Sequence, residues 1–143
     1  MKRLRFSIEI SAPQKTVWHA LWNDRSFRDW ANLIDEGTYL VGELKEGNKV
    51  QWISASSGYG VTSLVEKLIT NERVVFRHMA DTKEDGQLER DNEWTGGREI
   101  YLLQAVNNGT RLTVELDAPP GQVKTFEEIL PKALERIKEL SEF

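Results

Sequence analysis

The chain has 143 residues, of which 39% are hydrophobic and 29% are charged, and its formal net charge is −4. This length suits one ordinary domain whose core is large enough to fold without cross-links, and the composition is that of a globular protein. The sequence contains no cysteine, which excludes disulfides, thiolate metal sites and cysteine nucleophiles. The acidic balance, with no long cluster of Lys and Arg, argues against nucleic acid as a partner.

The sequence shows no sign of a membrane or export signal. No apolar run approaches the roughly 20 residues that a helix needs to cross a bilayer. The first residues pass directly into an alternating pattern and lack the apolar stretch of a secretory signal. We therefore predict a cytoplasmic protein with no membrane span, consisting of a single domain over residues 1–143.

The N-terminal part predicts a strand followed by a helix. Apolar side chains alternate with polar ones over residues 4–10, which is the period of a half-buried strand. Pro13 then suits the first turn of a helix, where its missing N–H has no partner to lose. Val17 and Leu21, with a neighbouring pair of tryptophans at the same spacing, predict a helix of about three turns with a wide apolar face.

Further turn and cap signals predict a second short helix and then a series of strands. Asn23 and Asp24 should end the first helix and cap the next one, which ends before Asn32. From residue 35 onward, short β-rich runs alternate with Gly- and Asn-containing turns, the pattern of a meander. The six predicted strands cover residues 38–41, 49–54, 61–69, 73–80, 98–106 and 111–116.

Two of the connections carry more specific expectations. Asn108 and Gly109 predict a two-residue hairpin turn with positive φ at both positions, which would place Ala105 opposite Leu112 and Leu103 opposite Val114. The acidic segment 81–92 is predicted to be a loop at the surface.

The C-terminal part predicts a long helix. Thr125 and Glu128 fit a capping box at its start, and apolar residues at helical spacing follow as far as Leu140. Pro131 should remove one helical hydrogen bond and bend this helix. The order of elements is therefore strand, two helices, six strands and a long helix. This order predicts an α+β fold in which a curled antiparallel sheet of about seven strands surrounds the C-terminal helix.

Several segments together resemble the SRPBCC or START-like superfamily, whose fold is known as the helix grip. Within it, the chain is most similar to the branch named after the activator of the ninety-kilodalton heat-shock protein ATPase. The segments that carry the resemblance are Ile10–Pro13, Val17–Leu21, Trp30, Lys45–Trp52, Glu72–Phe76 and Gly109–Val114. The resemblance implies a hydrophobic cavity between the sheet and the C-terminal helix.

Candidate residues for this cavity are mainly aromatic. Such residues would favour a flat apolar ligand through burial and stacking, although most aromatic residues in a domain of this size belong to its core. His78 is in phase with Val74 and Phe76 and should point into the cavity, although a hydrogen-bonded histidine near a strand end is commonplace. The candidates are Trp30, Trp52, Phe76, His78, Trp94, Tyr101, Leu103, Phe126 and Leu130, with Glu93 as a further residue at the cavity mouth.

The sequence contains no motif for a metal site, a cofactor or a nucleophilic serine. The leading hypothesis is therefore non-catalytic binding or sensing of a small hydrophobic or aromatic molecule. One alternative is a cofactor-like partner of a chaperone ATPase, and another is a cyclase- or hydrolase-like enzyme that uses His78 with a carboxylate such as Glu93. Ile100 and Leu102 also suggest an apolar outer face of the sheet, and with it a homodimer contact.

Overall fold

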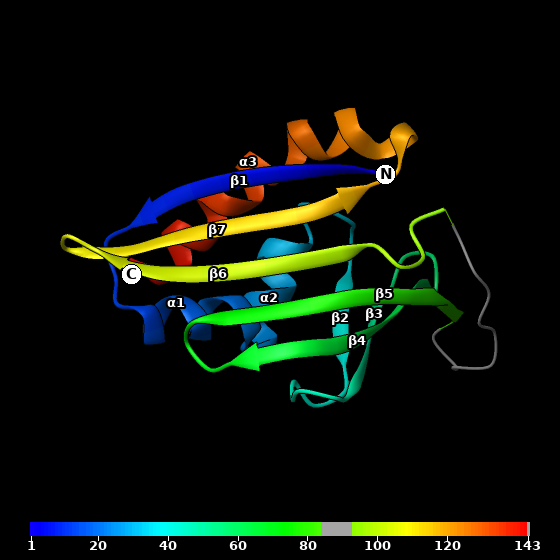
Figure 1. Ribbon diagram of the computed structural model, residues 1–143, viewed down its shortest axis with the longest axis horizontal. Coiled ribbons are helices and arrows are strands. Elements are labelled where there is room, and N and C mark those ends of the chain that lie inside the picture. The colour runs from blue at the N-terminus through cyan, green and yellow to red at the C-terminus, as the bar shows by residue number, and fades with distance from the viewer. Residues whose placement is uncertain (84–92, 143) are drawn as a thin grey trace.

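The computed structural model describes residues 1–83 and 93–142, and within them it contains three α-helices and one antiparallel sheet of seven strands. The strands follow the order β1-β7-β6-β5-β4-β3-β2, so β1 and β2 form the two edges (Figure 1). In chain order the elements are β1 (Lys2–Ile10), α1 (Gln14–Trp22), α2 (Asp24–Ala31), β2 (Thr38–Val41), β3 (Lys49–Ser54), β4 (Tyr59–Ile69), β5 (Arg73–Lys83), β6 (Arg98–Val106), β7 (Gly109–Ala118) and α3 (Val123–Ser141). The predicted α+β class, order of elements and curled sheet are confirmed.

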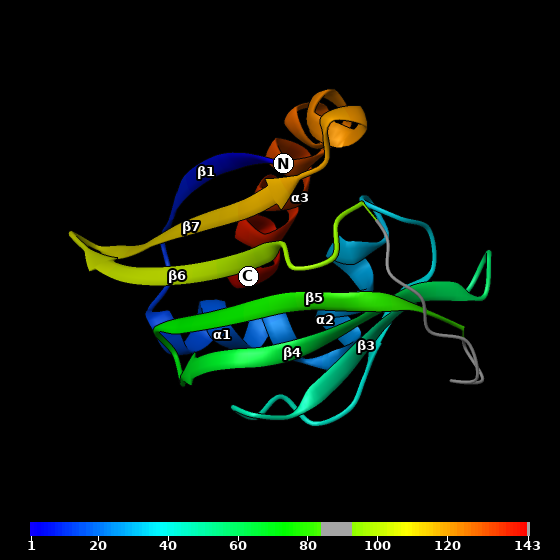
Figure 2. The same cartoon turned by 45° about the vertical axis from the view of Figure 1, so that its right-hand side comes forward.

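The sheet curls around the helices, and the core lies between them. Figure 2 shows the three helices on the concave side of the sheet, with α3 beside β1. Trp22 on α1 stands at the centre of an aromatic cluster, because its ring lies 4.8 Å from that of Tyr101 and 5.5 Å from that of Phe76. The largest side chains with almost no exposed surface are Trp30, Phe27, Phe76, Ile10, Leu21, Ile53, Leu112 and Ile137. Burial of this apolar surface is the main force that holds α3 against the sheet.

Asn23 separates the two short helices, as the sequence predicts. Its backbone N–H bonds to the carbonyl of His19 and so closes α1, while its side chain accepts a hydrogen bond from the backbone N–H of Arg25 and caps α2. One residue thus satisfies groups at two helix ends, which lets α2 turn away from α1 without a loop.

The predicted β6–β7 hairpin is correct, but its predicted register is wrong. The structure pairs Leu103 with Leu112 and Ala105 with Thr110, because the turn residues are Asn107 and Asn108, and Gly109 already belongs to β7. Asn108 has a φ of 65°, whereas Gly109 is not in the left-handed region. The reason for glycine at position 109 is close approach: a Cβ there would lie 2.1 Å from the carbonyl oxygen of Ile10.

The start of α3 also differs from the prediction. A short 3-10 turn over Pro120–Gln122 leads directly into α3, so Thr125 already lies inside the helix and no side chain caps its first turn. The predicted capping box is therefore wrong. Pro131 lies within α3, as expected, where it cannot bond to the carbonyl four residues earlier. In Figure 2 the first turns of α3 run in a different direction from the rest of the helix.

The predicted acidic loop begins later than expected, because the preceding strand is longer. β5 continues through Asp81 and Thr82 to Lys83, where the sequence indicates a loop from residue 81. Asp81 pairs with Val61 and Lys83 pairs with Tyr59, so the pairing of β5 extends to the first residue of β4. The remainder of the predicted loop, residues 84–92, lies outside the described residues.

A row of charged side chains crosses the outer face of the sheet. Asp117 accepts hydrogen bonds from the Arg3 guanidinium at 2.5 and 3.2 Å and from the backbone N–H of Arg98 at 2.9 Å. The Arg98 side chain in turn donates to Glu66 at 2.7 Å, and Arg77 lies 3.4 Å from the same carboxylate. The hydrogen bond from Arg3 lowers the pKa of Asp117, and the hydrogen bond from Arg98 lowers that of Glu66. These contacts link β1, β7, β6, β5 and β4.

Ile100 and Leu102, which suggest a dimer contact, are half-buried, and their strand partners include Val75 and Glu115. Tyr101 and Leu103 are buried on the opposite face. A homodimer through this surface stays a prediction.

Candidate functional site

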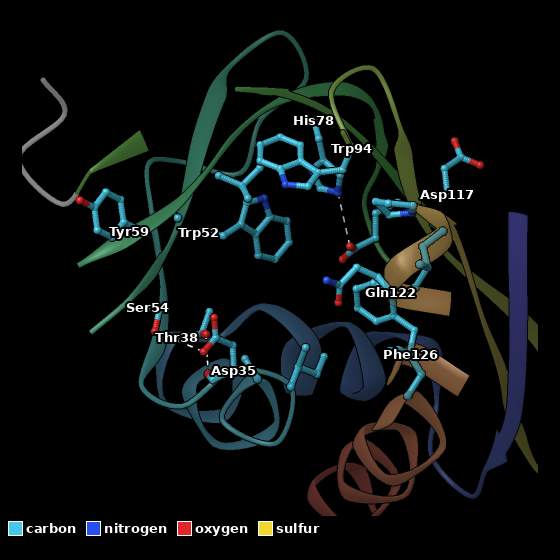
Figure 3. A pocket seen from close by; sticks show the side chains of 18 of the residues that line it. Asp35, Thr38, Trp52, Ser54, Tyr59, His78, Trp94, Asp117, Gln122 and Phe126 are labelled. Atoms are coloured by element: carbon cyan, nitrogen blue, oxygen red, sulfur yellow. Dashed lines mark hydrogen bonds and ion pairs between the residues drawn. The ribbon is translucent and has the colours of Figure 1, made fainter. Parts of the chain in front are cut away.

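A cavity of about 440 Å³ lies between the inner face of the sheet, α2 and the first part of α3. Its inner wall is formed by buried apolar side chains, among them Trp30, Tyr101 and Leu130. Exposed side chains at its rim come from Asp35, Tyr59, Glu93 and Gln122. Figure 3 shows Trp52, His78 and Trp94 gathered at one end, with Phe126 contributed by α3. A volume of this size is within the range of small-molecule sites.

Seven of the nine predicted cavity residues line this space, and Glu93 lies at its rim. The seven are Trp30, Trp52, His78, Trp94, Tyr101, Phe126 and Leu130. Phe76 and Leu103 do not line it and belong to the core beyond its wall. Phe76 instead stands behind the wall, with its ring 4.8 Å from that of Trp52.

The position of His78 follows from the strand pattern and from a turn that folds onto it. Val74 and Phe76 are fully buried, and His78 continues their inward face until a bulge at Met79 interrupts the β4–β5 ladder. The backbone of His78 bonds to Gly96 and Gly97 at 2.7 and 2.9 Å, which holds the turn at the start of β6 against β5. This turn places the Trp94 ring edge-on to the imidazole, with 5.9 Å between ring centroids.

A chain of polar contacts runs through the wall and ends at one carboxylate. The indole N–H of Trp52 donates to Ser63 Oγ at 2.9 Å, and Ser63 Oγ lies 2.7 Å from His78 Nδ1. His78 Nε2 lies 3.5 Å from Glu99 Oε1, and the Tyr101 hydroxyl donates to Glu99 Oε2 at 2.5 Å. When Ser63 accepts from the indole and donates its own proton to Nδ1, every member of the chain is satisfied and Nε2 carries a proton toward Glu99.

Glu99 is the central group of this chain, and the sequence reasoning missed it. Burial raises the pKa of the Glu99 carboxyl, but the interactions with His78 and with the Tyr101 hydroxyl outweigh burial and leave the pKa below its ordinary value. Burial, the Glu99 charge and the same hydrogen bond raise the pKa of Tyr101 well above its ordinary value. A carboxylate therefore persists in the cavity wall at neutral pH.

A signal for Glu99 does exist in the sequence. Glu99 shares its strand face with Tyr101 and Leu103, which are both buried, so strand alternation alone places it inside. The carboxylate that His78 Nε2 approaches is thus Glu99, which was not among the candidates, whereas the candidate Glu93 lies at the exposed rim.

Within the described residues, this series of polar contacts contains no accessible nucleophile, and there is no metal centre. Ser63 has the hydrogen-bond partner expected of an activated serine, but it is completely buried, does not line the cavity and already accepts a hydrogen bond from Trp52. Within residues 1–83 and 93–142, no three His, Asp or Glu side chains gather to hold a metal ion. Across the same ranges, no helix has the length and apolar character required to cross a membrane.

Comparison with known proteins agrees with the fold of the chain. A family model described as Activator of Hsp90 ATPase homolog 1-like protein matches residues 11–142. The chain belongs to this family. The match confirms the resemblance seen in the sequence, and it covers the three α-helices and every strand except β1. A search of curated proteins found no match to this chain.

Solved structures share the fold of this Activator of Hsp90 ATPase homolog 1-like chain at low sequence identity. The solution structure of the Aha1 dimer from Colwellia psychrerythraea is 21% identical, with a TM-score of 0.73 over 100% of this chain and 98% of that one. MLL2253 from Mesorhizobium loti is 17% identical, with a TM-score of 0.74 over 97% and 96% of the two chains. DynU16, described as a putative protein in the dynemicin biosynthetic locus, is 16% identical with a TM-score of 0.71, and the match covers 97% of this chain but 46% of DynU16. At these identities the likeness shows the fold alone.

Proposed function

We propose that this chain binds a small hydrophobic or aromatic molecule in the cavity between the sheet and α3, without catalysing a reaction. The observation that carries the proposal is the cavity of about 440 Å³ with indole, phenol and phenyl rings in its wall. Rings provide large apolar contact areas and prefer edge-on or offset contacts with a flat ligand. The burial of Ser63 supports a binding role, because the hydroxyl nearest to the histidine cannot reach a bound molecule.

Thermal denaturation in the presence of a library of apolar and aromatic compounds tests this proposal. A ligand at a hundred times its Kd stabilises the native state by about 2.7 kcal/mol. For a domain of this size that corresponds to a rise in Tm of about 8–10 °C. Native mass spectrometry of the protein as purified from cells complements the library, since a retained compound would be seen directly as added mass.

A matched pair of variants locates the binding site. Val61 lines the cavity and is half-buried, so Val61→Trp should fill part of the space and remove the rise in Tm. Val41 is 43% exposed on the edge strand β2 and does not line the cavity, so Val41→Trp should keep the rise. The proposal fails if no compound raises the Tm of the wild type, or if both variants respond to the ligand as the wild type does.

The approach of His78 to Glu99 supports a second candidate function, proton transfer to or from a bound molecule. In that case a compound incubated with the protein in D2O would be released with a changed mass, because a carbon that gains a proton would take up deuterium, and Glu99→Gln would abolish the change. Recovery of every bound compound unchanged, with binding intact, contradicts the catalytic role and leaves the binding role in place.

A further inference from the structure

The strongly charged side chains around the cavity are all acidic. The described residues that line it include four carboxylates but neither Lys nor Arg. The other ionisable groups in the lining are His78, Tyr59 and Tyr101. The carboxylates belong to Asp35, Glu93, Glu99 and Asp117. A site that holds an apolar molecule by its carboxylate or phosphate normally supplies a guanidinium or ammonium group for it. The lining therefore disfavours an anionic ligand.

The four carboxylates are not equivalent. Asp117 is engaged by the Arg3 guanidinium and the Arg98 backbone N–H from the outer face, and in Figure 3 its carboxylate points away from the centre of the cavity. Asp35 and Glu93 lie at the exposed rim, where water screens their charge. Glu99 lies in the wall with 23% of its side chain exposed, and the basic group nearest to it is an imidazole rather than a permanent cation.

The hydrogen bonds at Glu99 leave it able to accept more from a ligand. Tyr101 donates to one of its oxygens and His78 approaches the other, whereas an ionised carboxylate has about four acceptor positions. Both neighbours are committed to Glu99, and Trp52 donates to Ser63. The wall thus offers a bound molecule an acceptor, and the donors of Tyr101, His78 and Trp52 are already engaged.

The aromatic rings beside Glu99 are suited to a ligand that carries a positively charged hydrogen-bond donor. Trp52, Trp94 and Tyr101 all line the cavity together with Glu99. The faces of indole and phenol rings attract organic cations within about 6 Å of the ring centre. A carboxylate among such rings is a combination that favours an ammonium group on an apolar body.

We propose that the cavity selects an apolar or aromatic molecule that carries an ammonium group, whose N–H groups donate to the Glu99 carboxylate. The inference rests on the proposed binding function, and it names the chemical class of the ligand. A neutral molecule of the same shape would bind more weakly, and the corresponding carboxylic acid would be excluded by repulsion from Glu99 and from the acidic rim.

The test uses three apolar bodies, phenylethyl, naphthylethyl and octyl, each as the amine, the alcohol and the carboxylic acid. Their Kd values are measured by tryptophan fluorescence and isothermal titration at neutral pH. We expect the amine of at least one body to bind 10-fold or more tightly than its alcohol, and the acid to bind more weakly than either. In Glu99→Gln the amine should lose 10-fold or more in affinity, while the alcohol changes by less than about threefold.

Glu115→Gln is the matched control, because it removes the same charge from the neighbouring strand β7 at a residue that does not line the cavity. It should leave the amine preference intact. Equal binding of amine and alcohol, tighter binding of the acid, or an amine preference that survives Glu99→Gln overturns the ammonium inference while the binding function stands. If no probe and no library compound binds, both proposals fail. The wild-type series tests the preference even if a variant does not fold.

Discussion

Tyr101→Phe should destabilise the protein in a way that depends on pH. The substitution deletes one hydroxyl from a residue that is 2% exposed and leaves the ring packing in place. The lost hydrogen bond joins this hydroxyl to the Glu99 carboxylate at 2.5 Å. Hydrogen bonds to charged groups contribute about 1.5–3 kcal/mol to the free energy of unfolding. The expected decrease in Tm at neutral pH is therefore about 5–10 °C.

The pH dependence follows from the sign of the pKa shift. The pKa of Glu99 is lower in the folded protein than its ordinary value, so the interactions that lower it contribute stability above the ordinary glutamate range. That contribution is lost as the pH falls through the folded-state pKa. The variant lacks one of these interactions, so the stability gap between wild type and Tyr101→Phe should be largest at pH 7 and shrink toward pH 3. Other carboxylates titrate in both proteins and cancel in the comparison.

Urea denaturation followed by tryptophan fluorescence measures this gap at several pH values. Tyr59→Phe is the control, because Tyr59 is 49% exposed and its substitution should change stability by less than about 0.5 kcal/mol. A cycle with Glu99→Gln isolates the coupling between the hydroxyl and the charge. A stability gap that is absent at pH 7, or that is the same at pH 3, refutes the reasoning.

Three further predictions concern the frame of the fold. Gly109→Ala should cost more than about 2 kcal/mol because it forces β1 and β7 apart, whereas Gly121→Ala, whose new Cβ would meet nothing within 4 Å, should be close to neutral in urea denaturation. Ile137→Ala should cost about 2–5 kcal/mol, since this α3 residue is 1% exposed; a loss below 1 kcal/mol would mean that α3 is not part of the core. Asp117→Asn should lower Tm at pH 7, because the hydrogen bond from Arg3 holds the pKa of this carboxyl below its ordinary value, and the difference should vanish at lower pH or in 1 M salt; a constant difference would point to lost packing instead.

Local sequence patterns predict the elements of this fold well and their relative alignment less well. Strand alternation and the Asn23 cap depend on neighbouring residues, and the structure confirms both. The β6–β7 register was wrong by two residues because Asn107, Asn108 and Gly109 are all turn formers. The choice among them is made by the end of β1, whose Ile10 carbonyl leaves room for glycine alone at position 109.

In the candidate site too, features set by neighbouring residues could be predicted, whereas features set by contacts between distant residues could not. The rings at Trp52 and Tyr101 could be assigned to the inner face from alternation. Glu99 is not among the predicted cavity residues because an isolated glutamate is normally exposed. What makes its burial tolerable is the approach of His78 from β5, which depends on the pairing of strands about 20 residues apart in sequence and on the bulge at Met79.

Pro131 divides α3 into two parts on which selection acts differently. After it, Ala133, Leu134 and Ile137 are locked into the core, where a change of volume is costly. Before it, Phe126 is a half-buried residue that faces the cavity, and most of its helical neighbours are exposed. Substitutions in the first turns can therefore alter one wall of the cavity while foldability is preserved. A relative of this chain can acquire a new ligand by changing those turns, and a mutant library restricted to them should yield a high share of folded proteins.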